Sequence, residues 1–203
     1  MMTDSVTRST TITYKIAHSL YLNITNRCSN TCTFCPKFDE YKLKGNDLLL
    51  ESEPTFEEVM AAIGEPGEID EVVFCGFGES LLRLDLVVRV AKELKERCNY
   101  RIRINTDGQA NLVHGRNILP ELAGLVDCIS VSLNAPDSAT YMRLCRTPFG
   151  REGFTSLCDF IREAKIHIPQ VIASVVTVPG VDVAACQKLA ELLGASFRIR
   201  ELT

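Results

Sequence analysis

The sequence predicts an α/β protein whose parallel strands and helices form a partial (β/α)6 TIM-like barrel, preceded by a short N-terminal hairpin. Strand-like and helix-like segments alternate along nearly all of the 203 residues, a pattern typical of parallel strands joined by right-handed crossovers. The six units are too few for a closed eight-stranded barrel. Polar and glycine-rich segments follow the strands, at the ends where such barrels carry their chemistry. We therefore expect one domain over residues 1–203.

The composition is that of one domain with its own core, since 46% of the residues are hydrophobic and the formal net charge is −4. No apolar run approaches the ~18–20 residues that a membrane span needs. Residues 1–11 are polar and lack the features of a signal peptide, so we expect a disordered lead-in. Nine cysteines without a secretion signal favour a cytoplasmic protein. The mild acidity does not indicate direct nucleic-acid binding.

The first elements are a hairpin and a core strand. Polar and apolar residues alternate over 11–16, and after a turn at His18 the strand-like segment 20–25 follows. Pro36 should prevent a helix directly behind this region. A charged excursion over 37–53 contains few apolar residues before the run at 48–50. It either covers a site or forms a solvated loop with one apolar anchor.

Polar caps and glycine stops delimit the helices. Thr55 and Glu58 form a capping-box pattern, and Asp85, Asp137 and Asp182 are placed to cap later helices. Glycine or proline follows the first and last helices, at Gly64, Pro66 and Gly194. The predicted helices are 55–63, 85–97, 116–123, 137–146, 153–165 and 182–194. The predicted strands are 20–25, 71–76, 101–105, 127–134, 171–178 and 196–201.

Alternate residues of the strands separate into an apolar and a polar face. The apolar set, expected to face the helices, is Leu20, Leu22, Ile24, Val72, Phe74, Ile102, Ile104, Ile129, Val131 and Leu133. The opposite set is Tyr21, Asn23, Thr25, Val73, Cys75, Arg101, Arg103, Asn105, Cys128, Ser130, Ser132 and Asn134. Buried polar groups need partners, so this second face indicates a ligand-filled lumen. Arg103 either contacts that ligand or pairs with Glu71 or Glu201. If it points inward together with Arg198 or Arg200, the substrate carries a carboxylate or phosphate.

A C-x3-C-x2-C run of Cys28, Cys32 and Cys35 follows the first core strand. Three thiolates on one loop can hold three irons of a [4Fe–4S] cube, and the lack of a fourth nearby cysteine leaves one iron open. A structural zinc site needs a second ligand pair, whereas the next cysteine is Cys75. The run therefore predicts an iron–sulfur site that can bind a small molecule. The remaining cysteines are interpreted as small core residues without cluster spacing: Cys98, Cys128, Cys145, Cys158 and Cys186.

This spacing resembles that of the radical S-adenosylmethionine (SAM) superfamily, and the resemblance covers roughly residues 19–201. It implies an enzyme with a [4Fe–4S] cluster and SAM as cofactors. Such an enzyme cleaves SAM to a 5′-deoxyadenosyl radical that abstracts hydrogen from a small or partner-borne substrate. The resemblance also implies that Phe34 lies near the adenine, although this ring is equally suited to shield the cluster from water.

The turn after the second predicted strand resembles the Gly-Gly-Glu motif of the family. It reads Gly76-Phe77-Gly78-Glu79, with Ser80 in place of the usual final proline. The resemblance implies that Gly76, Gly78 and Glu79 bind the amino group of SAM. Glu79 is also suited to stabilise the start of the following helix.

Two further segments carry residues that the resemblance assigns to SAM. Asn105 and Asp107 belong to a turn similar to an Asn-Thr-Asn-Gly segment of the family, in which Asp107 is expected to accept a hydrogen bond from a ribose hydroxyl. The alternative is an Asx turn with Gly108 at positive φ. Ser132 and Asn134 match a strand region that contacts the ribose or carboxylate of SAM in relatives.

Three other polar residues are weaker candidates. Arg143, with Arg146 as its rival, is suited to clamp a carboxylate, or is an exposed helix charge. His114 is a candidate proton donor or substrate contact, although a histidine in a loop is usually solvated. Together with Arg103, His114 completes the set of candidate catalytic residues.

Four segments resemble the small radical SAM family associated with TatD-type nucleases, namely 22–28, 76–79, 101–111 and 131–136. This implies a nuclease-family functional partner, besides a reductant protein such as flavodoxin or ferredoxin. Alternatives within the superfamily are an enzyme like a glycyl-radical activase and one like 7-carboxy-7-deazaguanine synthase. An iron–sulfur electron carrier is the alternative outside the enzymes, and SAM binding would distinguish it.

Overall fold

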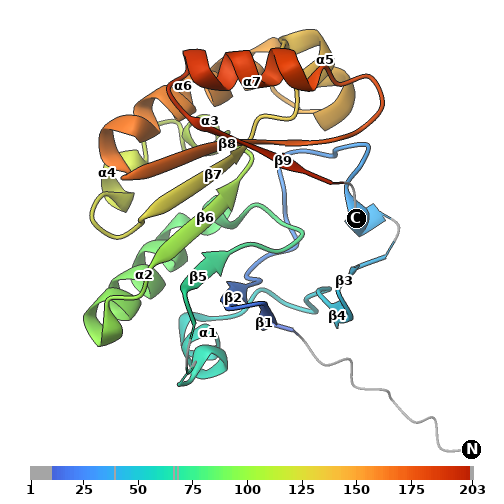
Figure 1. Cartoon of the computed structure of the whole chain (residues 1–203). Helices are drawn as coiled ribbons and strands as arrows, with labels where there is room; N and C mark the ends of the chain where they lie inside the picture. Colours follow the sequence, from blue (N-terminus) through green and yellow to red (C-terminus); the bar gives the residue numbers. More distant parts are fainter. Residues whose placement is uncertain (1–10, 39, 66, 68, 202–203) are drawn as a thin grey trace, which may run out of the picture.

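A curved seven-stranded sheet is the frame of the computed structural model, which describes residues 11–38, 40–65, 67 and 69–201 (Figure 1). Its strands follow in the order β1 (Thr13–Ile16), β2 (Ser19–Leu22), β5 (Glu71–Phe74), β6 (Ile102–Thr106), β7 (Cys128–Ser132), β8 (Gln170–Val176) and β9 (Ser196–Arg200). β1 is antiparallel to β2, and every later pair is parallel. Since β1 and β9 stand at the two ends of this order, the barrel is partial, as predicted.

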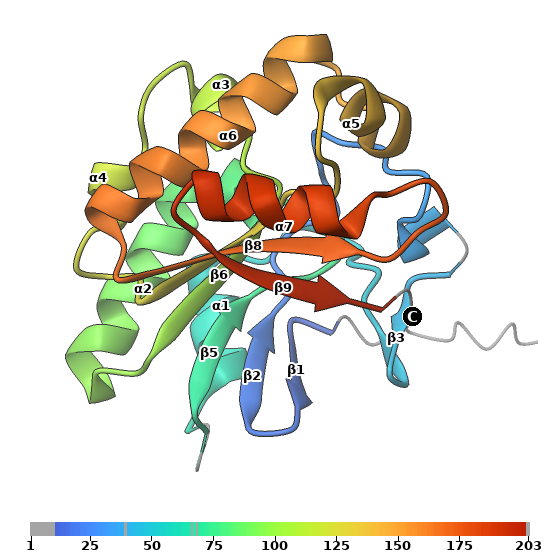
Figure 2. The same cartoon turned by 45° about the horizontal axis from the view of Figure 1, so that its top comes forward.

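The helices cover one face of this sheet (Figures 1 and 2). They are α1 (Phe56–Ile63), α2 (Leu84–Cys98), α3 (Ala110–His114), α4 (Leu119–Leu122), α5 (Ser138–Cys145), α6 (Gly150–His167) and α7 (Val183–Leu192). A small hairpin, β3 (Lys42–Leu43) and β4 (Asn46–Asp47), lies beyond the end towards which β8 and β9 point (Figure 2). Throughout the described ranges, each helix is too short or too polar to cross a bilayer.

The predicted division of the strand faces is confirmed. The complete apolar set joins the buried core with the helices, and Leu22, Phe74 and Ile104 are fully buried. On the other face, Asn23, Ser130 and Asn134 are buried although they are polar. The alternation therefore correctly predicts a polar interior. Arg101 is the exception, because it precedes β6 and is exposed.

Side-chain caps begin three of the described α-helices, namely α1, α5 and α7. Thr55 Oγ1 accepts a hydrogen bond from Glu58 N at 3.2 Å, and Glu58 Oε2 accepts one from Thr55 N at 2.7 Å, which confirms the capping box. Asp137 and Asp182 cap α5 and α7 in the same way, through the backbone N–H three residues on. Gly64 ends α1 at φ +52°.

The prediction that Asp85 caps α2 is wrong. The helix begins one residue earlier, at Leu84, directly after a 3-10 helix over Ser80–Arg83. Glu79 caps that short helix instead, since its Oε1 accepts a hydrogen bond from Leu81 N at 3.0 Å. The predicted cap at Asp85 lies too late in the sequence, because helical geometry already begins at Ser80, directly after the Gly76–Glu79 turn.

Other local predictions need correction. Pro36 does not exclude helical structure but begins the 3-10 helix Pro36–Phe38, because the first position of a helix needs no N–H donor. The single helix expected over 116–123 is replaced by α3 and α4, and Gly115 ends α3 in the left-handed conformation. Cys98 is exposed because it is the last residue of α2. The expected lead-in at 1–11 lies outside the described residues except for Thr11, and Pro66 also lies outside them.

Candidate active site

The carboxyl ends of the parallel strands and the cysteine loop line a cavity of about 570 Å³. Nearly all the predicted site residues line it: Cys28, Cys32, Cys35, Phe34, Gly76, Gly78, Glu79, Asn105, Asp107, Ser132 and Asn134. Residues more than a hundred positions apart in the sequence thus share one cavity. The structure therefore brings together every proposed cluster or cofactor residue except Arg143.

The cysteine loop is fixed by backbone contacts to a distant helix. Thr31 N donates to Cys145 O at 3.2 Å and Thr33 N donates to Leu144 O at 2.8 Å, which ties the loop to the end of α5. The thiols of Cys28, Cys32 and Cys35 are partly buried. No group of ligand side chains in the described ranges is close enough to hold a single metal ion. Three separated thiols instead suit a cluster in which each thiolate binds a different iron.

The environment of the thiols keeps them protonated without metal. Burial raises the pKa of Cys28, and the nearby Asp107 carboxyl adds to this. A hydrogen bond with the Cys145 thiol is the main cause that raises the pKa of Cys32, followed by burial. Burial also raises the pKa of Cys35. Iron binding must therefore displace protons from these thiols.

Two carboxyl groups meet beside the cysteine loop. Glu79 is buried, and its Oε2 accepts a hydrogen bond from Asp107 N at 2.6 Å. Asp107 Oδ2 accepts a hydrogen bond from Ser29 Oγ at 2.6 Å, which joins the cysteine loop to the end of β6. Burial, and then the charge of Asp107, raise the pKa of Glu79 well above its ordinary value, and burial raises that of Asp107. A cationic group such as an ammonium would stabilise both carboxylates.

The two glycines of the Gly-Phe-Gly-Glu turn are required by close backbone packing. A Cβ on Gly76 would lie 2.2 Å from Asn23 Oδ1, and a Cβ on Gly78 would lie 2.1 Å from Thr25 O. Neither position has room for a side chain, so the turn can pass directly beside β2 and bring Glu79 into the cavity. The motif predicts contact of these glycines with SAM, whereas the packing observed here is against Asn23 and Thr25, directly after β2.

The excursion over 37–53 covers part of the cavity. Leu43 in β3 is among the lining residues, and the ring of Tyr41 contacts Phe77 edge-on at a centroid distance of 5.8 Å. Leu48 is fully buried and anchors the segment, and its carbonyl accepts a hydrogen bond from Asn23 Nδ2 at 2.9 Å. Of the two alternatives for this segment, the structure favours the cover over the solvated loop.

A buried polar network beneath the cysteine loop was not predicted. Gln109 Nε2 donates to Asn30 Oδ1 at 3.0 Å and to Tyr141 OH at 2.6 Å, while Gln109 Oε1 accepts from Thr147 Oγ1 at 2.7 Å. Asn30, Gln109 and Tyr141 are almost completely buried. These residues come from three distant segments, so neither spacing nor periodicity indicates their contact.

The candidate catalytic residues lie outside the cavity. Arg103 forms an ion pair with Glu71, in which Arg103 Nη2 lies 2.7 Å from Glu71 Oε1. Of the two alternatives for Arg103, the structure therefore favours pairing with Glu71 over contact with a ligand. His114 Nε2 lies 2.8 Å from Leu81 O. Arg143 is exposed, and its Nη2 donates to Gly180 O at 3.4 Å. The arginine that lines the cavity is Arg200.

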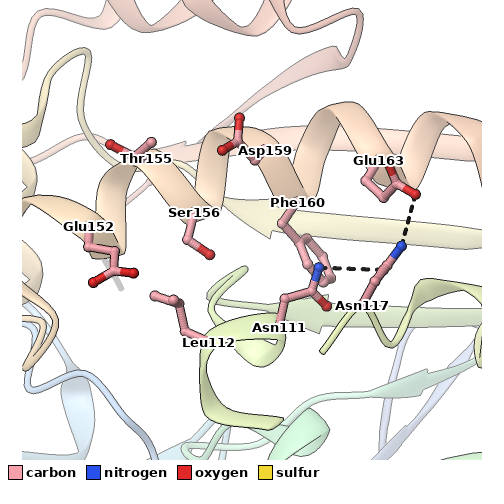
Figure 3. Close-up of a pocket in the computed structure, with 9 residues that line it drawn as sticks. All are labelled: Asn111, Leu112, Asn117, Glu152, Thr155, Ser156, Asp159, Phe160 and Glu163. Atoms are coloured by element: carbon pink, nitrogen blue, oxygen red, sulfur yellow. Dashed lines mark hydrogen bonds between the residues drawn. The ribbon is translucent and has the colours of Figure 1, made fainter. Parts of the chain in front are cut away.

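A second cleft, of about 430 Å³, lies between α6 and the α3–α4 segment (Figure 3). It is lined by Asn111, Leu112, Asn117, Glu152, Thr155, Ser156, Asp159, Phe160 and Glu163. Its polar groups contact one another, since Asn117 Nδ2 donates to Glu163 Oε1 at 2.8 Å (Figure 3). Its lining residues do not overlap with those of the cysteine cavity. The sequence motifs therefore all belong to the first cavity.

Comparisons with known proteins agree with this geometry. A family model described as the Radical SAM superfamily matches residues 22–193. A radical SAM methyltransferase from Sphaerobacter thermophilus has a TM-score of 0.63 and 16% identity, over 93% of this chain and 68% of that chain. No curated protein sequence matches significantly.

Two other solved structures have a similar fold. Methylornithine synthase (PylB) has a TM-score of 0.59 and 16% identity, over 91% of this chain and 53% of that chain. Native anSMEcpe with bound AdoMet has a TM-score of 0.59 and 13% identity, over 90% of this chain and 50% of that chain. At such identities the likeness shows the fold alone, and the present chain spans about half the length of these two proteins.

Proposed function

Since the chain belongs to the radical SAM superfamily, whose enzymes use a [4Fe–4S] cluster and SAM, we propose that it abstracts hydrogen from a small or partner-borne, anionic substrate. The chemistry that these cofactors supply when bound is reductive cleavage of SAM to methionine and a 5′-deoxyadenosyl radical. Cys28, Cys32 and Cys35 would hold the cluster. One observation carries the proposal, namely that the three thiols and the pair of carboxyl groups line the same cavity.

The carboxyl pair suits the amino group of SAM. Glu79 is buried and Asp107 is half-buried, and neither has a cationic side chain in an ion pair with it among the described residues. An ammonium group would satisfy both, because hydrogen bonds and opposite charge stabilise the ionised form of a carboxyl. Glycines at 76 and 78 let the turn that carries Glu79 pack directly against Asn23 and Thr25.

Other lining residues support contacts with the rest of SAM. We assign Phe34 to the adenine, and Asn105, Ser132 and Asn134 to the ribose or carboxylate. Asn134 is buried in the left-handed conformation, and its Oδ1 accepts a hydrogen bond from Val176 N at 3.1 Å. This bond joins the ends of β7 and β8, so Asn134 would also keep the cavity wall in shape.

The test is anaerobic reconstitution with iron and sulfide, followed by reduction with dithionite, addition of SAM and measurement of 5′-deoxyadenosine. We expect formation in the wild type, none in Cys28→Ala and a weaker yield in Glu79→Ala. Cys98→Ala is the matched control, because Cys98 is exposed at the end of α2 and should leave the yield unchanged. A loaded and reduced cluster that neither binds nor cleaves SAM would contradict the proposal.

Radical SAM enzymes generally need a reductant protein such as flavodoxin or ferredoxin, and we propose that one serves this enzyme in the cytoplasm. The resemblance to the TatD-associated family favours a nuclease-family functional partner. Enzymes like a glycyl-radical activase or 7-carboxy-7-deazaguanine synthase are the alternatives for the reaction. An electron carrier is disfavoured, because a carrier needs neither the glycine turn nor a polar cavity of this size.

A further inference from the structure

Arg200 is the feature of the cavity that the assigned cofactor contacts leave unexplained. It is the last residue of β9, and its side chain lines the cavity. Its Nη2 donates to Ser132 Oγ at 3.2 Å, while its Nε is buried without a hydrogen-bond partner. In the described part of the chain, Arg200 forms no ion pair with any carboxylate. A guanidinium stays protonated in proteins, so Arg200, which is half-buried, carries a charge without a paired carboxylate.

Arg103, which is buried but does not line the cavity, differs from Arg200 in its contacts. Its Nε and Nη2 bind Glu71, its Nη1 donates to Asn105 Oδ1 at 2.7 Å, and its Nη2 also reaches Tyr21 OH. All three nitrogens of this guanidinium are therefore satisfied within the protein. Arg200 has one such contact and keeps an unused donor.

We propose that Arg200, oriented by its hydrogen bond to Ser132, binds a carboxylate or phosphate group of the substrate. The assignment to a substrate rests on the proposed function. A guanidinium binds either group through two parallel hydrogen bonds, and the buried Nε provides a donor for this. Burial lowers the pKa of Arg200, which reflects the cost of the charge in this position and which a bound anion would offset.

The position of Arg200 favours the substrate over SAM as the source of the anion. Glu79 and Asp107 follow β5 and β6, whereas Arg200 ends β9, three positions beyond β6 in the sheet. Neighbouring strands are about 4.8 Å apart, so the backbones of β6 and β9 lie ~14 Å apart along the sheet, while the Arg200 side chain extends to Ser132 at the end of β7. The amino and carboxylate groups of SAM share one carbon atom. A SAM molecule whose amino group lies at the carboxyl pair would thus have its carboxylate near that pair.

The first test is binding of inorganic phosphate to the reconstituted protein, measured by 31P NMR or calorimetry in phosphate-free buffer. We expect saturable binding in the wild type and binding weakened by at least about tenfold in Arg200→Gln, since a hydrogen-bonded charge is removed. Arg198→Gln is the matched control, because Arg198 lies two residues earlier on the same strand, is exposed and changes the net charge equally. Ser132→Ala is a second variant, with a smaller expected loss. Equal binding in all four proteins would overturn the proposal.

The second test identifies the source of the anion. SAM and decarboxylated SAM are titrated into the wild type and Arg200→Gln, with the visible absorbance of the cluster as the control for assembly. We expect the variant to bind both compounds as the wild type does. If Arg200→Gln binds SAM more weakly than the wild type but binds decarboxylated SAM equally well, Arg200 contacts the SAM carboxylate. This result would overturn the substrate assignment. Failure of the proposed function is distinct, because the wild type would then make no 5′-deoxyadenosine while phosphate binding still depended on Arg200.

Discussion

Arg103→Met should destabilise the protein. The change removes the nearer of the two cationic partners of Glu71, whose side chain is only 17% exposed, and also removes a donor to Asn105. Breaking a buried ion pair by removing one partner costs about 3–5 kcal/mol, because the other charge stays buried. The lower end of this range applies here, since Glu71 retains some contact with water. We therefore expect the free energy of unfolding to fall by about 3 kcal/mol and Tm by about 6–12 °C.

The assay is urea unfolding of the cluster-free protein under reducing conditions, followed by circular dichroism. A double variant, Arg103→Met with Glu71→Leu, should lose less than the sum of the two single losses, because it leaves no charge unpaired. Phosphate binding should stay at the wild-type level, because Arg103 does not contact Arg200 or Ser132. A loss below about 1 kcal/mol, well short of the ion-pair range, together with weaker SAM or phosphate binding, would refute the structural role and restore Arg103 as a ligand residue.

The same ion pair predicts a pH dependence. Burial alone would raise the pKa of Glu71, but the hydrogen bonds and charge of Arg103 lower it below its ordinary value. A carboxyl with a lowered pKa in the folded state contributes stability above its unfolded pKa, about 4.3 for glutamate. This contribution is lost as the pH falls through the lower, folded value. The difference in stability between the wild type and Arg103→Met should therefore shrink below about pH 4.

Three further outcomes are expected. Gly78→Ala should unfold at a much lower temperature than the wild type, because the new Cβ would lie 2.1 Å from Thr25 O. Gly115→Ala, where the Cβ meets open space and only the positive φ is strained, should cost about 1 kcal/mol. Gln109→Leu should cost about 2–3 kcal/mol by leaving its buried partners unsatisfied, and iron analysis should find less iron per chain. Since burial keeps the Cys28 thiol protonated, reconstitution in unbuffered solution should release protons, and iron uptake should fall as the pH is lowered; uptake independent of pH would contradict this.

Local signals in the sequence were sufficient for the frame and for much of the cavity. The capping box at Thr55 and Glu58 and the cysteine spacing each act within a few residues, so each can be interpreted alone. The period-two pattern of the strands likewise assigns most apolar positions to one face, with Val73 as an exception. In a partial barrel this is enough to place the turns after the strands around one cavity, as observed for Glu79.

The remaining features depend on three-dimensional contacts that the sequence does not encode locally. Which acid pairs with Arg103 depends on the register of β5 and β6, which sets Val73 opposite Arg103 and brings Glu71 within reach. The contact of Gln109 with Tyr141 joins segments 32 residues apart. The start of α2 was misjudged because Asp85 was assigned as its cap, whereas the helical geometry begins earlier, with the 3-10 helix that Glu79 caps. The role of Glu79 at a helix start, which the sequence also suggested, is confirmed.

The two sides of the cavity differ in how far the protein satisfies its own polar groups. On the side of the cysteine loop, the carboxyl groups of Glu79 and Asp107 accept hydrogen bonds from backbone N–H groups and from Ser29 Oγ. Substitution of either residue should therefore lower stability and cofactor binding together. On the side of β9, Arg200 has one hydrogen bond and an uncompensated charge. A charge that is partly withdrawn from water without a paired carboxylate loses hydration that nothing offsets, so its removal should not lower the stability. Arg200→Gln should thus unfold at or above the wild-type temperature while it loses phosphate binding, and a drop in Tm would instead indicate that Arg200 is a structural residue.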